Sequence, residues 1–205
     1  MKIKIWMIRH GMTAGNRQQR YVGTTDELLC EEGRQQIILK RQLIKSYQNI
    51  QNVYVSPMLR CRETAEILFP AVSQITEAGF RECSFGEFEY RNYQELNGHP
   101  DYQAWIDSNG TLPFPGGESR EEFRNRNLRG FEKVVTSCIR SHVTEVALVV
   151  HGGTIMNIME EYTDIQKQFY EWHVKNGGGY EVELDENMWK NGRKQLKLKS
   201  SIMEG

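Results

Sequence analysis

The segment that starts at Arg9 places an arginine beside a histidine, and residues 9–16 read RHGMTAGN. It directly follows a short apolar run from Ile3 to Ile8, which predicts a first β-strand. The arginine offers a fixed cation, His10 offers an imidazole nucleophile, and the glycines allow the backbone to approach a ligand closely. These residue types therefore indicate a loop that binds an anion and attacks it.

A second segment adds another cation at a helix start. Residues 56–65 read SPMLRCRETA and follow the short apolar run of residues 53–55, which predicts a second strand. Arg60 then falls in the first turn of a predicted helix, where the backbone N–H groups already attract anions. Its guanidinium adds a bidentate phosphate donor at this position.

A third segment, residues 145–150, is a strongly β-type run that ends at His151 and two glycines. In open α/β sheets, ligands bind beyond the carboxyl ends of the strands. We therefore expect the three strand ends to bring Arg9, His10, Arg60 and His151 together around one anion.

Hydrophobic periodicity and capping signals predict the elements that position these side chains. A capping box at Ser119 and Glu122 opens a long helix, and two consecutive strands follow the last predicted helix. The predicted ranges are strand 3–8, helix 31–47, strand 53–55, helix 57–68, a helix from residue 119 with an apolar stripe up to residue 139, strand 145–150, a helix to about residue 162, and strands 180–184 and 196–198. This order favours an α/β fold with a mostly parallel central sheet and helices on both faces.

Residues 83–117 interrupt this alternation with glycines and prolines among aromatic side chains. Because the segment carries large apolar rings, we interpret it as a lid-like excursion from the core and not as a linker between domains. Neither an internal repeat nor a low-complexity stretch divides the chain. We therefore expect residues 1–205 to form a single domain.

The composition limits the partners of the chain. Its 205 residues include 26 Lys and Arg against 27 Asp and Glu, and this net charge of −1 argues against a nucleic-acid surface. Residues 1–62 nevertheless hold eleven Lys and Arg against four Asp and Glu, an excess that suits an anionic ligand. The apolar runs are shorter than the about 18 residues that a membrane-spanning helix needs, so we expect no membrane partner.

The four cysteines are widely spaced, at positions 30, 61, 83 and 138, and form no zinc-binding pattern. A carboxylate cluster suited to Mg²⁺ does not accompany the three segments either. We therefore expect neither a metal nor another cofactor. Structural disulfides are not expected, and a reducing cytoplasmic location is the default for such a chain.

Taken together, the three segments resemble the motifs of the histidine phosphatase superfamily, which includes the cofactor-dependent phosphoglycerate mutases. The matching stretches are RHGxTxxN at residues 9–16, SPxxRCxxTA at 56–65 and VVHGG at 149–153. The resemblance extends from about Lys4 to Leu184. It implies a three-layer α/β/α sandwich of the phosphoglycerate mutase type and a phosphohistidine formed on His10.

The same resemblance implies roles for the other motif residues, which contact the phosphoryl group or the rest of the substrate. This set consists of Arg9, Asn16, Gly23, Arg60, His151 and Gly152. The two arginines and His151 hold the phosphoryl oxygens. Asn16 occupies the last position of the first motif, which contacts phosphate or orients the loop.

The superfamily takes its general acid from a segment that resembles ExxFGxWEG, and the stretch RECSFGEFEY matches it in part. Glu82 is then the acid, whereas Glu87 and Glu89 are interpreted as loop or lid residues. Phe88 and Tyr90 depart from the usual Trp and Gly, which leaves the shape of the lid open. To protonate a leaving alcohol near neutral pH, Glu82 needs a pKa raised by burial or by the neighbouring anionic phosphate.

The expected activity is hydrolysis of a small-molecule phosphate ester. A phosphoglycerate mutase is the alternative, but its pattern has His-Tyr-Gly after the acid and Arg-Arg before Gly-Glu-Ser. This chain has CSFG at residues 83–86 and FPGG at residues 114–117, and both departures favour a phosphatase that releases its product to water. A non-catalytic protein that recognises phosphate is a further alternative, although recognition alone needs no acid. The oligomeric state stays open.

Within the superfamily, four stretches are similar to the alpha-ribazole phosphatases of cobalamin nucleotide-loop assembly. They are RYVGTTD at residues 20–26, FGEFE at 85–89, PGGES at 115–119 and Asn176-Gly177. Related small-molecule phosphatases share much of this pattern, so broad sugar-phosphate hydrolysis is the alternative. The resemblance implies alpha-ribazole 5′-phosphate as the substrate, whose flat base could stack on the aromatic residues of the excursion.

Overall fold

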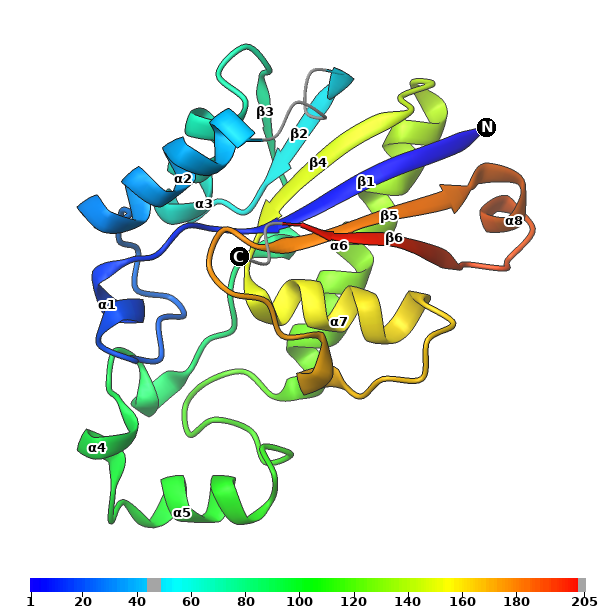
Figure 1. Cartoon of the computed structure of the whole chain (residues 1–205). Coiled ribbons are helices and arrows are strands. Elements are labelled where there is room, and N and C mark those ends of the chain that lie inside the picture. The colour runs from blue at the N-terminus through cyan, green and yellow to red at the C-terminus, as the bar shows by residue number, and fades with distance from the viewer. Residues whose placement is uncertain (44–48, 203–205) are drawn as a thin grey trace.

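The computed structural model describes residues 1–43 and 49–202. Its centre is a six-stranded sheet in the order β3-β2-β4-β1-β5-β6, drawn as a fan of arrows in Figure 1. Neighbouring strands run parallel from β3 to β1, whereas β5 pairs antiparallel with both β1 and β6. The strands are β1 (Lys2–Arg9), β2 (Asn52–Val55), β3 (Gln74–Thr76), β4 (Glu145–Val150), β5 (Gly179–Asp185) and β6 (Leu196–Ile202). The predicted mostly parallel sheet is confirmed.

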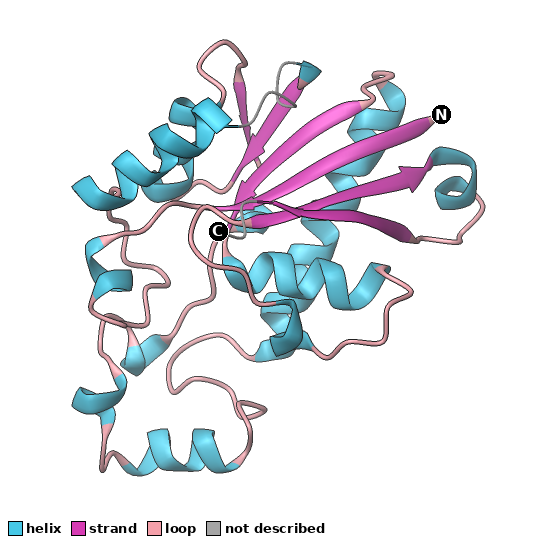
Figure 2. Cartoon of the chain, viewed as in Figure 1, coloured by secondary structure: helices cyan, strands magenta, loops and turns pink. Residues whose placement is uncertain are grey.

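The central strands are apolar on both faces, because helices cover both sides of the sheet (Figure 2). Ile3, Ile5 and Met7 of β1 pack on one side with residues of α6 (Arg120–Arg140) and α7 (Gly152–Tyr162). The alternate residues Trp6 and Ile8 pack on the other side with α2 (Glu31–Leu43) and α3 (Leu59–Leu68). The predicted three-layer α/β/α sandwich is therefore confirmed.

The start of α6 agrees with the sequence, and the start of α3 differs from it. The capping box predicted at Ser119 is present, with its hydroxyl accepting the Glu122 N–H. The helix predicted from Pro57 begins two residues later, because Met58 is extended and the Leu59 N–H donates to a side chain, that of Asp26. The helix predicted over 31–47 is described as far as residue 43, and the rest of that range lies outside the described residues.

The remaining helices are short. They include α1 (Ala14–Arg17), α4 (Tyr93–Leu96), α5 (Pro100–Asp107), α8 (Glu186–Lys190) and the 3-10 turns Ala78–Phe80, Gly86–Phe88 and Phe169–Trp172. Both α4 and α5 belong to residues 83–117 and lie away from the sheet, at the bottom of Figure 1. Throughout residues 1–43 and 49–202, no helix is long and apolar enough to cross a membrane.

Candidate active site

The three predicted segments meet at the carboxyl edge of the sheet. His10 directly follows β1, His151 directly follows β4, and these strands are neighbours in the sheet. Arg60 is the second residue of α3, the helix that follows β2 on the other side of β4. The two imidazole rings lie edge to face, with their centroids 5.2 Å apart, and both are buried. The expected convergence of these side chains is present in the structure.

The imidazole of His10 is held in one tautomer. Its Nδ1 lies 2.7 Å from the carbonyl oxygen of Gly11, and because a carbonyl oxygen only accepts, Nδ1 carries the proton. The Gly11 N–H in turn donates to the hydroxyl of Thr64 on α3 at 2.9 Å. Burial, reinforced by Arg60 and Arg9, lowers the pKa of His10 well below 6.5. His10 is therefore a neutral imidazole whose Nε2 carries the free lone pair.

Two arginines beside His10 keep part of their donor capacity unused. Arg60 is fully buried, and three of its five N–H groups donate to the backbone carbonyls of Val22, Gly23 and Thr25, at 2.9–3.2 Å. Arg9 donates from Nη1 to the carbonyl of Val174 at 2.8 Å. The Nε atoms of both arginines are buried and have no hydrogen-bond partner among the described residues. Unpartnered buried donors are costly, so this pair is suited to a buried anion.

The loop of residues 22–25 is held from two sides. Arg60 binds its carbonyl groups, and the carboxylate of Glu89 accepts the N–H groups of Gly23 and Thr25, both at 2.9 Å. Gly23 is required here because a Cβ atom would collide with the carbonyl oxygen of Cys83. Glu89 thus has a definite structural contact, although its sequence context indicated a loop or lid residue only.

Asn16 joins the first motif to the loop that precedes β5. Its Oδ1 accepts from the side-chain amide of Asn176 at 3.1 Å and from the Thr13 N–H at 3.3 Å. The same Asn176 amide donates to the carbonyl of His10 at 3.1 Å. Asn16 therefore orients the loop that carries His10.

His151 lies between a serine and the predicted acid. Its Nε2 is 2.8 Å from the hydroxyl of Ser56, and its Nδ1 is 3.6 Å from Oε2 of Glu82. Burial lowers the pKa of His151 well below 6.5 and raises the pKa of Glu82 above 4.5. A neutral histidine next to a carboxyl group with a raised pKa is the arrangement that a proton donor requires. Gly152, the next residue, begins α7 and lies against the Arg9 guanidinium.

Arg126 fixes the backbone that carries Glu82. Its guanidinium donates to the carbonyls of Gly79, Arg81 and Glu82 at 2.7–3.2 Å and pairs with the carboxylate of Glu118 at 2.7 Å. Glu118 also accepts the N–H of Ser84, two residues after Glu82. The residues on both sides of Glu82 are therefore held by Arg126 of α6 and by Glu118, which lies just before the N-terminus of that helix.

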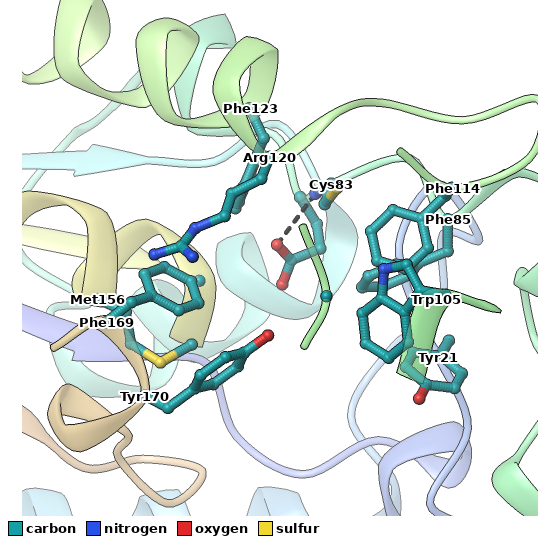
Figure 3. Close-up of a pocket in the computed structure, with 13 residues that line it drawn as sticks. Tyr21, Cys83, Phe85, Trp105, Phe114, Arg120, Phe123, Met156, Phe169 and Tyr170 are labelled. Atoms are coloured by element: carbon teal, nitrogen blue, oxygen red, sulfur yellow. Dashed lines mark hydrogen bonds between the residues drawn. The ribbon is translucent and has the colours of Figure 1, made fainter. Parts of the chain in front are cut away.

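An aromatic pocket of about 220 Å³ opens beside Glu82, and Figure 3 shows its wall. Phe85, Trp105 and Phe114 come from residues 83–117, and Figure 3 places them opposite Phe123 and Arg120 of α6. The other lining residues are Tyr21, Glu82, Cys83, Gly110, Gly153, Met156, Phe169 and Tyr170. The pocket is mostly apolar, and its two charged lining residues among those described are Glu82 and Arg120.

Several residues that shape the site were not singled out from the sequence. Ser56 and Thr64 lie inside the second motif, so their spacing from Arg60 was a usable signal. Arg126 binds backbone groups more than 40 residues away, and no local sequence pattern predicts such contacts. Glu89 was named from the sequence as a loop or lid residue, but its contacts with Gly23 and Thr25 were not predictable for the same reason.

An α/β sandwich with two neutral histidines, one buried and one half-buried arginine and one carboxyl group at the carboxyl edge of its sheet defines a class of phosphate-handling proteins. The chain belongs to the histidine phosphatase superfamily (branch 1), whose family model matches residues 5–195. The predicted superfamily is thereby confirmed.

Similar proteins carry both phosphatase and mutase names. Phosphoglycerate mutase-like protein 4 of Arabidopsis thaliana is 29% identical over 164 residues, which cover 77% of this chain and 70% of that protein. The alpha-ribazole phosphatase structure from Shigella flexneri is 20% identical, with a TM-score of 0.80, and covers 98% of this chain and 96% of that one. The mycobacterial glucosyl-3-phosphoglycerate phosphatase is also 20% identical, with a TM-score of 0.77 and coverage of 97% and 98%. The TM-scores of these two solved structures show a shared fold, and at 20% identity they show the fold alone.

Proposed function

We propose that this protein is a phosphomonoesterase that hydrolyses a small-molecule phosphate ester through a phosphohistidine on His10. The observation that carries the proposal is the pair of buried, unpartnered Nε–H groups of Arg9 and Arg60 beside a neutral imidazole. A phosphoryl group supplies the oxygens that these donors lack, and it places phosphorus within reach of the imidazole.

In the first half of the proposed reaction, Nε2 of His10 attacks phosphorus. The N–P bond forms as the ester O–P bond breaks, and Glu82 gives its proton to the departing alkoxide. The fixed tautomer of His10 and the raised pKa of Glu82 both support these roles. Arg9, Arg60 and His151 stabilise the charge on the equatorial oxygens.

In the second half, Glu82 takes a proton from water as the water oxygen attacks phosphorus. The N–P bond breaks, and inorganic phosphate leaves with His10 neutral again. Asn16, Gly23 and Gly152 complete the proposed binding set. The amide of Gly23 already donates to Glu89, so we assign Gly23 to the loop that holds Arg60, and its direct contact with substrate stays a prediction.

The aromatic pocket supports a phosphatase over a phosphoglycerate mutase. A mutase has to retain and reorient a small bisphosphate with several anionic groups, whereas this pocket is lined mainly by rings and offers one cation, Arg120, among its described lining residues. Alpha-ribazole 5′-phosphate is the specific substrate that we propose, because its flat base suits stacking on such rings. The four cysteines are free thiols, which supports a reducing, cytoplasmic location as part of the same proposal.

Phosphate release from a panel of esters tests this function. The panel contains alpha-ribazole 5′-phosphate, 3-phosphoglycerate, sugar phosphates and 4-nitrophenyl phosphate, each assayed with wild type and with His10→Ala. We expect hydrolysis by the wild type, with the highest kcat/KM on the aromatic substrates, and none by a folded His10→Ala protein. Substantial turnover by folded His10→Ala contradicts the proposal, as does transfer of phosphate to phosphoglycerate in place of release.

A further inference from the structure

Arg120 is a cation in the wall of an otherwise aromatic pocket. It is the first residue of α6, and its side chain is 38% exposed. The guanidinium lies over the ring of Phe169, 4.8 Å from its centroid, and 3.6 Å from a carboxylate oxygen of Glu160. Among the described residues it makes this one loose ion pair and no hydrogen bond, so its donors remain available to a ligand.

Helix stability does not explain a cation at this position. A positive charge in the first turn opposes the helix dipole, and α6 already has Glu121 and Glu122 there to complement it. One turn later, Arg124 forms a closer ion pair with Glu161 of the same neighbouring helix, α7. Arg124 does not line the pocket, whereas Arg120 does. The two arginines therefore have the same partner helix and different surroundings.

The pocket has room for a compact ring. An apolar cavity of roughly 150 Å³ already holds a benzene molecule, and this pocket measures about 220 Å³. The pocket also contains the proposed acid, since a Cβ on Gly153 would touch both the Phe123 ring and Oε1 of Glu82. A ring bound here is thus part of the alcohol that leaves when Glu82 donates its proton.

We propose that Arg120 recognises a hydrogen-bond acceptor on the alcohol portion of the substrate, beyond an apolar ring that fills the pocket. This inference rests on the proposed function and narrows its substrate class to esters with a flat apolar body and an acceptor, such as a carboxylate or a ring nitrogen. Among such acceptors a guanidinium binds a carboxylate most strongly, and it repels a cation. The proposal makes Arg120 a specificity-determining residue for the leaving group.

Matched esters test this selectivity without changing the chemistry at phosphorus. Benzyl phosphate, its 3- and 4-carboxy derivatives and its 4-aminomethyl derivative share one CH₂–O–P centre. For the wild type we expect kcat/KM to rise about tenfold or more from benzyl to the better carboxybenzyl ester, as a charge-assisted hydrogen bond predicts. The aminomethyl ester should be the poorest of the four. In Arg120→Met, the kcat/KM for the better carboxybenzyl ester divided by that for benzyl phosphate should fall to about one.

Arg124→Met is the matched control, because it removes the neighbouring ion pair between the same two helices. An ion pair at this level of exposure contributes little to stability, so Arg124→Met should keep the wild-type order of substrates. If Arg120 only ties α6 to α7, then Arg120→Met lowers kcat/KM for all four esters by a common factor, and the selectivity proposal is wrong. A carboxybenzyl preference that survives Arg120→Met also overturns it.

A binding measurement separates failure of this inference from failure of the proposed function. Calorimetry with 3- and 4-(hydroxymethyl)benzoate and with benzyl alcohol reports on the pocket without any turnover. Tighter binding of at least one benzoate by wild type, lost in Arg120→Met, supports the inference even if none of the esters is hydrolysed. If neither benzoate binds more tightly than benzyl alcohol, the inference is wrong, whatever the phosphatase activity.

Discussion

Arg60 and Glu89 hold the same short loop through opposite groups of its backbone. The guanidinium of Arg60 donates to the carbonyls of Val22, Gly23 and Thr25. The carboxylate of Glu89 accepts from the N–H groups of Gly23 and Thr25. The loop is therefore fixed between a cation and an anion. Since Arg60 is the proposed phosphate ligand, any movement of this loop also moves the guanidinium.

The first prediction is that Glu89 positions Arg60. Glu89→Ala removes the acceptor for two N–H groups, so we expect loss of phosphate affinity, seen as a raised inhibition constant for inorganic phosphate together with a lower kcat/KM. Glu89→Gln retains a carbonyl acceptor and should restore most of both values. Glu87→Ala is the control, because Glu87 is an exposed carboxylate two residues away. Wild-type phosphate inhibition in Glu89→Ala would show that the loop holds Arg60 without Glu89.

The second prediction concerns the geometry of Arg60 itself. Arg60→Lys keeps the charge but loses the planar fork, so it cannot satisfy three carbonyls and a phosphoryl group together. We expect kcat/KM to fall by at least about tenfold, since a hydrogen bond to a charged group contributes about 1.5–3 kcal/mol. Steady-state kinetics on 4-nitrophenyl phosphate measure this loss. An unchanged kcat/KM in a folded Arg60→Lys protein would place Arg60 away from the phosphoryl group.

The positions of the main site residues could be predicted from the sequence because they follow strands directly. His10 and His151 each end a clear apolar run, and Arg60 follows a Ser-Pro pair at the third such end. Parallel strands bring these ends to one edge, so local patterns were sufficient to place them. The capping box of α6 was predictable for the same reason, since all of its contacts are within four residues.

Other features depend on contacts that no local pattern encodes. Strand β3 has three residues with one apolar side chain, Ile75, which is too weak a local signal to predict a strand, and it pairs in parallel with β2. Arg126 binds carbonyls that lie more than 40 residues earlier, so its role requires the folded chain. From the sequence alone Arg120 is an ordinary charged residue near the start of a helix. Its place in the pocket wall follows only from the folded structure.

The third prediction concerns the pH dependence of hydrolysis, which should follow the protonation states of Glu82 and His10. Hydrolysis needs protonated Glu82, whose pKa burial raises above 4.5, so kcat/KM for an alkyl phosphate should fall as the pH rises through that raised pKa. It also needs neutral His10, whose pKa burial lowers below 6.5, so activity should persist as the pH drops through 6.5. In Glu82→Gln the alkaline limb should disappear, at a rate reduced by about 10²–10⁴-fold. An alkaline limb that remains in Glu82→Gln assigns the acid to another residue.

The fourth prediction is that hydrolysis survives metal chelation, because arginines stabilise the phosphoryl charge. Glu87, His99 and Asp101 place ligand atoms within 4.8 Å of one another, but none of them belongs to the proposed site. Activity in excess EDTA should therefore equal the untreated rate. Loss of activity that Mg²⁺ or Mn²⁺ restores would contradict the metal-free mechanism.

The most direct test of the central claim is to trap the phosphoenzyme and locate its phosphate. Glu82→Gln lacks the base for the second half-reaction, so mixing it with 4-nitrophenyl phosphate, whose good leaving group needs little acid catalysis, should accumulate the intermediate. Trypsin cleaves after Arg9 and Arg17, and the resulting peptide contains His10 as its single histidine. After an alkaline quench, mass spectrometry should find one phosphate on this peptide, stable in base, lost in acid and absent from His10→Ala. Release of 4-nitrophenol without phosphate on this peptide, or with phosphate on another one, would contradict the account.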